Sequence, residues 1–360
     1  MLAETESDGN AMELLGVGLG VIVAFVWGSA DILATLAARR LRTFKTTFVS
    51  QSTGLLALVT FGILAFWLWH LPFTLTALGL SALIGIFTGL CAALGYFAFY
   101  RALEIGPVAI VSPLTATSST FTLILSIIIL QEQLTLGRIG FVSIVIFGIV
   151  LASTSLAELR TLLAKPGYSL WSPGVRWAIV ATLAFGAMDF GIGASASLTG
   201  WFLPVLWTRV FSIVFLTLIS YWKRHQRDTR ELKRAYAELP MRAPAPGQAP
   251  GTVPTEMTKI ERTLSLSLPS LDEIGHVRKP FSKIGLGVLL AVTAGIVENA
   301  AVLTFSLDTR ITTTGISSVI TSSYALVVMV FGMIAYHERL AKNQLFGIGM
   351  FMVGLFLLAL

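Results

Sequence analysis

The stretch FVWGSADILATLAARR, residues 25–40, lies in a strongly apolar part of the chain and places one carboxylate, Asp31, near its middle. An ionisable side chain at the centre of a bilayer costs about 3 kcal/mol or more, so such residues are usually paired or face a cavity. Whether this run crosses a membrane therefore decides the fold class. If it does, Asp31 is a candidate functional residue.

The composition favours a membrane protein. Of 360 residues, 55% are hydrophobic and 12% are charged, with a mean hydropathy of +0.81, whereas a soluble domain carries about 25% charged residues. A run of about 20 apolar residues can span a bilayer as a helix. Such runs predict an all-α membrane protein with ten transmembrane helices, at 14–38, 47–69, 76–99, 107–130, 137–157, 175–198, 203–222, 283–305, 312–336 and 341–360.

The loops differ in their content of Lys and Arg. Most of these cations follow the odd-numbered helices, whereas the other loops hold only Arg138 and Arg310. Because cytoplasmic loops carry the excess of positive charge, we expect a multi-pass protein of the cell membrane with both termini outside. The first helix follows an acidic tail at 1–13 and shows no clear cleavage site, so we expect it to be retained and not removed as a signal peptide.

The loop at 223–282 is much longer than the others. Its segment LPMRAPAPGQAPGTVP is rich in Pro and poor in aromatic residues, which predicts a disordered cytoplasmic linker. The basic stretch KRHQRDTRELKR at 223–234 is interpreted as a topology signal, with contact to anionic lipid as the alternative. We therefore relate the formal net charge of +6 to the lipid bilayer and not to nucleic acid, and we expect no nucleic-acid partner.

Residues that build metal and cofactor sites are scarce. Cys91 is the single cysteine, which excludes an intrachain disulfide and a Cys-based metal site. No phosphate-binding Gly loop, metal cluster or nucleophile with an adjacent base is visible. We therefore expect no metal, no cofactor and no enzymatic activity. The histidines lie at predicted helix ends or in loops: His70, His225, His276 and His337.

The chain repeats itself. An offset of 158 residues duplicates the carboxylate, and from the third helix onward the offset is 206 because the long linker intervenes. Five helices followed by five more place the second copy upside down, the plan of secondary transporters whose substrate site lies between the repeats. We predict repeats at 14–157 and 175–360. The aligned pairs are Trp27 and Phe185, Gly28 and Gly186, Asp31 and Asp189, Gln51 and Arg209, Ser112 and Ser318, Thr115 and Thr321, Glu132 and Glu338, and Gly148 and Gly354.

Several segments carry a resemblance to a known family. FVWGSAD opens the first repeat, YRALEIGPVAIVSPL leads into the fourth helix, and QEQLTLGRIG and HERLAKNQLFGIG join the last two helices of each repeat. Together they resemble the drug/metabolite transporter superfamily, EamA type. The resemblance implies a ten-helix carrier of small metabolites, with a central cavity lined mainly by the first, third, fourth, sixth, eighth and ninth helices.

A second resemblance concerns the first helix alone. ADILATLAARR, residues 30–40, is similar to the first helix of the small multidrug resistance proteins. In that related branch a membrane carboxylate exchanges protons for cationic drugs, and Asp31 takes that carboxylate's place.

Asp31 and Asp189 are the first candidate site residues. Each follows an aromatic residue and a glycine by one helical turn, on the same helix face. Burial and nearby charges govern the protonation of a carboxyl group, so each could gain and lose a proton as a cavity opens to either side. The alternative is a fixed ion pair or interhelical hydrogen bond. Trp27, one turn before Asp31, could stack on a substrate.

Arg209 is the one cation well inside a predicted helix, and it aligns with Gln51. It could pair with a carboxylate, grip a substrate carboxylate or extend to the interface, and we expect it to set which aspartate is ionised. Glu298 and Asn299 lie in the middle of the eighth helix, where the first repeat has alanines. This asymmetry suggests ligand recognition, with pairing to Arg209 as the alternative.

Hydroxyl groups form stripes in the fourth and ninth helices. Such groups often bond to their own helix or to a neighbouring one, so packing and cavity lining are both open. The candidates are Ser112, Thr115 and Ser119 in the fourth helix and Ser318, Thr321 and Tyr324 in the ninth.

The most direct interpretation is a secondary active transporter, an exporter or exchanger of a small metabolite, coupled to protons. Three membrane acids against one base favour an amino acid or amine as the substrate. A receptor or scaffold that acts through the linker is one alternative. An intramembrane aspartyl protease is another, although Asp189 follows Ala187 and Met188 where such proteases have a GxGD stretch. We expect a monomer or a homodimer.

Overall fold

The computed structural model describes residues 2–41, 43–69, 74–105, 111, 114–154, 156–164, 172–238, 281–336 and 341–358. Its described secondary structure is helical. The chain forms two compact units, one of Met1–Leu216 with Leu286–Leu360 and one of Thr217–Gly285. Ser112, Glu338 and most of the predicted linker lie outside the described residues.

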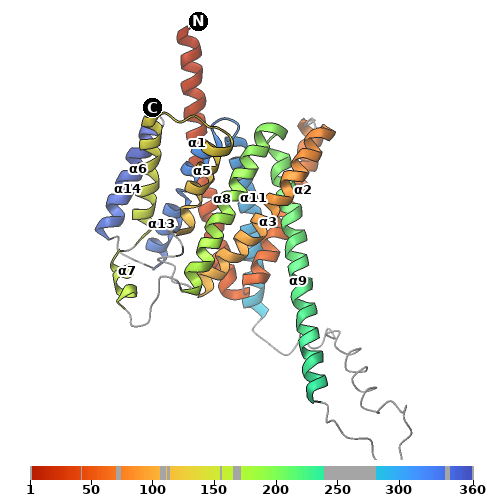
Figure 1. Ribbon diagram of the computed structural model, residues 1–360. Coiled ribbons are helices and arrows are strands. Elements are labelled where there is room, and N and C mark those ends of the chain that lie inside the picture. Colours follow the sequence, from red (N-terminus) through yellow and green to blue (C-terminus); the bar gives the residue numbers. More distant parts are fainter. Residues whose placement is uncertain are drawn as a thin grey trace, which may run out of the picture. The chain divides into compact units, whose positions relative to one another are not determined.

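In the described ranges the chain folds into helices only, and we list them in two sets that follow the two halves of the sequence (Figure 1). The first set is α1 (Leu2–Leu41), α2 (Thr43–Trp69), α3 (Leu75–Ile105), α5 (Ser118–Ile129), α6 (Leu136–Ser153) and the short α7 (Leu156–Leu163). The second set is α8 (Pro173–Thr199), α9 (Phe202–Glu238), α11 (Phe281–Asp308), α12 (Thr314–Thr321), α13 (Tyr324–Tyr336) and α14 (Lys342–Leu358).

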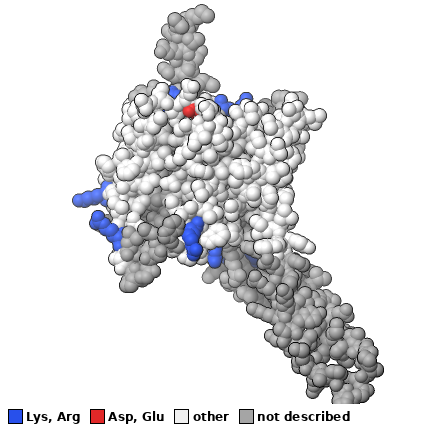
Figure 2. Space-filling view, viewed as in Figure 1, with Lys and Arg blue, Asp and Glu red and all other residues white. Residues whose placement is uncertain are grey.

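The distribution of side chains is that of a membrane protein. Large apolar residues are exposed, with Leu136 at 88% and Trp67 at 74% of their surface, whereas Arg209 is 2% exposed. Figure 2 shows a broad face without charged side chains, with Lys and Arg gathered toward its two ends. In the described part of the chain, seven helices are long and apolar enough to cross a membrane, within α1, α2, α3, α6, α8, α9 and α11. The protein is therefore a multi-pass membrane protein.

Two of the predicted spans are interrupted. The helix expected at 312–336 is divided by a turn at Ser322 and Ser323, since α12 ends at Thr321 and α13 begins at Tyr324. The hydroxyls of Ser322 and Ser323 donate to the carbonyls of Val319 and Ile320 at 2.6 and 2.7 Å, in competition with the helical pattern. In the fourth predicted helix a turn at Thr117 precedes α5, and its hydroxyl donates to the Leu114 carbonyl at 2.6 Å.

These two breaks fall at equivalent places, because residue 117 aligns with residue 323 under the offset of 206. The other expected spans correspond to apolar helices that are shorter than the seven long ones. In the described part of the chain they lie at Leu114–Ile129, Thr314–Val328 and Lys342–Leu358. The helix expected at 137–157 ends earlier, at Ser153.

Close helix contacts recur at equivalent positions of the two halves. A methyl group added at Gly28 would lie 3.0 Å from the carbonyl oxygen of Tyr324, and one at Gly186 would lie 2.6 Å from the carbonyl oxygen of Ser118. The offsets of 158 and 206 convert the first contact into the second. Glycine allows this approach because it lacks a Cβ atom. The first helix of each repeat thus packs closely on the broken helix of the other repeat.

Helices α6 and α14 pack against each other in a reciprocal way. A methyl group at Gly148 would lie 2.6 Å from the amide nitrogen of Phe351, and one at Gly354 would lie 3.0 Å from the amide nitrogen of Val145. The offset of 206 exchanges the two contacts. Such an exchange is what a two-fold relation between the repeats requires, so the packing favours the internal repeat predicted from the sequence.

Candidate functional site

A cavity in the first unit lies at the two helix breaks and contains about 480 Å³ of space not filled by atoms, part of it open. Residues of α1, α3, α5, α8, α12 and α13 form its wall. Interrupted membrane helices at corresponding places of two repeats are a common feature of carrier binding sites. The lining residues are Trp27, Asp31, Tyr96, Phe99, Ser118, Ser119, Phe185, Met188, Asp189, Ser318, Thr321, Ser322 and Tyr324.

Both membrane aspartates line this one cavity. Asp189 is 7% exposed, and its Oδ1 atom is buried without a hydrogen-bond partner. Asp31 is half-buried, and among the described residues neither carboxyl group has a hydrogen bond or an ion pair. An ionised carboxylate that is buried without a partner is costly. Both carboxyl groups are thus available to a proton or to a ligand that enters the cavity.

Aromatic rings form much of the remaining wall. The rings of Trp27 and Phe305 have centroids 5.7 Å apart, and those of Phe185 and Phe99 have centroids 5.9 Å apart. These pairs are equivalent under the two offsets. Tyr96 meets Phe185 edge to face at 5.0 Å. Aromatic faces attract cations, so rings and carboxylates together make this wall suited to a positively charged group.

The predicted hydroxyls serve both of the roles considered for them. Ser119 and Thr321 line the cavity and also donate to carbonyls of their own helices, at 3.3 Å to Ala116 and 3.0 Å to Ser318. Thr115 is buried and donates to its own helix at 3.0 Å, beside Tyr324 but outside the lining.

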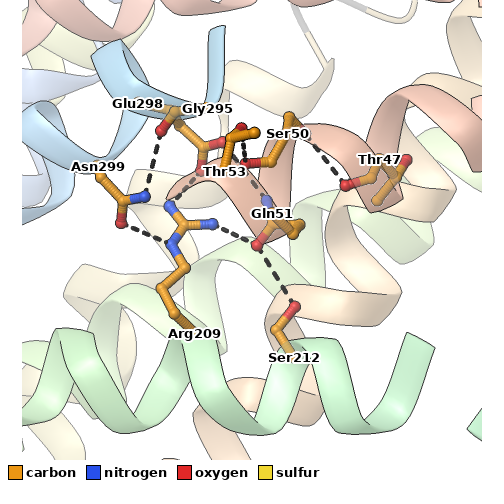
Figure 3. Close-up of polar contacts among 9 residues, drawn as sticks. All are labelled: Thr47, Ser50, Gln51, Thr53, Arg209, Ser212, Gly295, Glu298 and Asn299. Atoms are coloured by element: carbon orange, nitrogen blue, oxygen red, sulfur yellow. Dashed lines mark hydrogen bonds and ion pairs between the residues drawn. The ribbon is translucent and has the colours of Figure 1, made fainter. Parts of the chain in front are cut away.

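A second polar cluster, which we call the arginine network, joins α2, α9 and α11 (Figure 3). The guanidinium of Arg209 contacts Glu298 at 2.5 Å, donates through Nε to Asn299 at 2.9 Å and donates through Nη1 to Gln51. Gln51 donates to the other Glu298 oxygen at 3.4 Å. All four side chains are at most 4% exposed. Gln51 and Arg209 are repeat equivalents, and they touch each other.

These contacts correspond to the pairing role considered for Arg209, and extension to the interface is wrong. Among the described residues the guanidinium has no hydrogen bond or ion pair with either aspartate, and the expectation that it sets which aspartate is ionised stays a prediction. The guanidinium forms its ion pair with Glu298, where the first repeat has an alanine. Glu298 and Asn299 do not line the cavity, and α11 contributes no lining residue, unlike the eighth helix implied by the family resemblance.

Tyr96 connects the arginine network to the cavity. Its ring lies 5.5 Å from the Cζ atom of Arg209, and the same side chain is part of the lining. The network thus lies directly behind one wall of the cavity, with its positive charge balanced by Glu298.

Glu132 caps the N-terminus of α12, one of the helices that line the cavity. Its carboxylate accepts from the backbone amides of Thr314 at 2.9 Å and Gly315 at 3.2 Å, at the start of α12. An anion at a helix N-terminus satisfies free amides and is favoured by the helix dipole.

Sequence reasoning missed several lining residues, namely Tyr96, Phe99, Ser118, Phe185, Met188 and Ser322. The repeat could have found two of them, because Phe185 aligns with Trp27 and Ser118 aligns with Tyr324. The others reach the cavity only through tertiary packing.

Comparisons with known proteins agree with the resemblance seen in the sequence. Residues 14–154 match the EamA-like transporter family, which confirms the family prediction for the first repeat. No curated protein matches the chain. Of 28 similar chains among solved structures, one described as a crystal structure of a protein is 14% identical, with a TM-score of 0.55 over 96% of this chain and 98% of that chain. At this identity the likeness shows the fold alone.

Proposed function

We propose that this protein, whose residues 14–154 match the EamA-like transporter family, is a secondary active transporter of the cell membrane that exchanges a small metabolite for protons. The family is one of membrane transporters of the drug and metabolite type and is generally non-enzymatic. One observation carries the proposal: two carboxyl groups that have no hydrogen bond or ion pair within the described part of the chain face a single cavity between its halves.

The proposal includes ten membrane crossings in two inverted five-helix repeats. Seven long apolar helices and three shorter apolar segments support this number. The reciprocal contacts of α6 with α14 support a two-fold relation. The beginning of α1 and the end of α14 lie at the same end of their unit (Figure 1), as an even number of crossings requires.

In the proposed cycle, a carboxyl group of the cavity holds either a proton or a positively charged group of the substrate. Because an ionised carboxylate in an empty cavity is costly, release of the substrate is coupled to uptake of a proton. Hydroxyls of Ser119, Ser318 and Thr321 orient polar groups of the substrate. The Arg209–Glu298 pair is neutral as a whole and supports the wall behind Tyr96.

The lining also bears on the substrate class. None of the described lining residues is Lys or Arg, while two are aspartates. An amine or an amino acid therefore fits the site better than a simple anion.

The test is flux in proteoliposomes with an imposed proton gradient. Asp31→Asn keeps the shape of the side chain and removes its titratable proton, so it should abolish gradient-driven transport while the protein still folds. Asp308→Asn is the matched control, because Asp308 is a buried carboxyl group that accepts from Ser317 at 2.6 Å and lies outside the cavity lining. This control should retain coupling per folded molecule.

Full gradient-driven uptake by Asp31→Asn would show that Asp31 is structural. A scaffold would move no solute, and a protease would cleave a substrate in the same vesicles.

A further inference from the structure

The two carboxyl groups of the cavity are equivalent members of the repeat, and neither has a partner in the described part of the protein. We propose that the cavity is built for a dication, an alkyl diamine with one ammonium group for each of Asp31 and Asp189. This inference rests on the proposed function and names the substrate class of that site.

The first argument is the charge of the wall. Ionised, Asp31 and Asp189 give the cavity two negative charges, and no Lys or Arg is among the described lining residues. Arg209 lies behind Tyr96 but is paired with Glu298 at 2.5 Å. A monocation would pair with one carboxylate and leave the other carboxyl group to a proton, whereas a dication pairs with both carboxylates.

The second argument is the placement of the two groups. Asp31 belongs to α1 and Asp189 to α8, which are the first helices of opposite repeats. Among the described residues, neither carboxyl group has a hydrogen bond or an ion pair with a protein group. Two separate anionic ends on opposite repeats correspond to a ligand with two separate cationic ends.

The third argument is the apolar material around them. Rings of Trp27, Phe185 and Tyr324 belong to the same lining. Such rings pack against methylene groups and attract ammonium groups. An alkyl chain that carries ammonium groups at both ends matches this alternation of apolar and anionic wall.

The exchange balances in charge. With the cavity empty of substrate, each carboxyl group carries one proton. On binding, two protons leave to water and two carboxylate–ammonium pairs form, so the net charge of the loaded cavity is the same as that of the protonated cavity. Among the described residues, the other titratable groups beside the two carboxyl groups are Tyr96 and Tyr324 of the lining and the buried Tyr100, with the Glu298–Arg209 pair behind Tyr96.

The test measures binding to the full-length protein in detergent, by the thermal midpoint as a function of amine concentration. A ligand that binds only the folded state raises this midpoint, by an amount that grows with the logarithm of the ratio of its concentration to its dissociation constant. The probes are 1,4-diaminobutane and 1-aminobutane at equal pH and equal ionic strength. We expect the diamine to bind about tenfold or more tightly, because it makes one additional charge-assisted hydrogen bond.

Two variants and a control locate the effect. In Asp31→Asn and in Asp189→Asn the preference should fall to about threefold or less, because one ammonium group loses its carboxylate. Asp308→Asn should keep the preference, since Asp308 lies outside the lining. Equal affinity for both amines in the unmodified protein overturns the inference without need of any variant. So does a preference that survives in both aspartate variants.

Flux measurements separate this inference from the proposed function. If the diamine binds with the stated preference but no amine crosses the proteoliposome membrane, the inference stands and transport of this class fails. If a neutral or anionic solute is carried while neither amine binds, transport stands and the dication inference is overturned.

Discussion

Replacing Arg209 by Met tests whether the arginine network holds a buried ion pair together. Met retains much of the side-chain length but removes the guanidinium that contacts Glu298 at 2.5 Å, where the two side chains are 3% and 5% exposed. Removing one partner of a buried pair costs about 3–5 kcal/mol, because the remaining charge is left uncompensated. We therefore expect the folding equilibrium to fall by a factor of about 100 or more.

The double variant Arg209→Met with Glu298→Leu separates the charge from the hydrogen bonds. It removes both charges of the arginine network. The Gln51 side chain still accepts from Ser212 at 3.4 Å, and the Asn299 side chain still donates to the Gly295 carbonyl at 3.2 Å. The expected loss is about 1–3 kcal/mol, for polar atoms that lose a partner. The double variant should thus be more stable than Arg209→Met alone.

The assay is equilibrium unfolding in detergent, with Thr304→Val as the control. Thr304 lies on the same helix, α11, and its hydroxyl donates only to its own helix, to Ala300 at 2.8 Å, so its loss should change stability by about 0.5 kcal/mol or less. If Arg209→Met costs no more than the double variant, Glu298 does not depend on Arg209 for compensation and the reasoning is refuted.

Three further predictions concern packing, topology and the linker. Gly28→Ala should lower stability by about 1–3 kcal/mol, because its methyl group would lie 2.6 Å from the nearest side chain; Gly18→Ala, with nothing within 4 Å, should not, and equal thermal midpoints would contradict the contact. A cysteine introduced at position 5 should react with an impermeant reagent on intact cells and one at position 240 should not, and the reverse pattern would place both termini in the cytoplasm. Deleting residues 240–275 should leave folding and transport nearly intact, because the first repeat joins its equivalent helices by only a few residues; loss of folded protein would make the segment part of the core.

The sequence alone determined the membrane class, the internal offsets and part of the cavity. Hydropathy reports on membrane helices because the length and apolarity that a bilayer requires are local properties of the chain. Asp31 and Asp189 stand out for the same reason, since a carboxylate in an apolar run is costly wherever the run packs. Their shared register in the repeat was visible as a constant offset.

Only the tertiary structure decided which charges meet. The sequence offered three candidate acids for Arg209, and the packing of α9 and α11 paired it with Glu298. The break at Ser322 and Ser323 was also hidden, because serine is tolerated in membrane helices and its hydroxyl bonds back to a carbonyl inside a regular helix as well, as Ser143 does to Ile139 at 2.8 Å. Pairing across helices depends on distances between segments far apart in the chain, and a single sequence does not encode those distances in any local pattern.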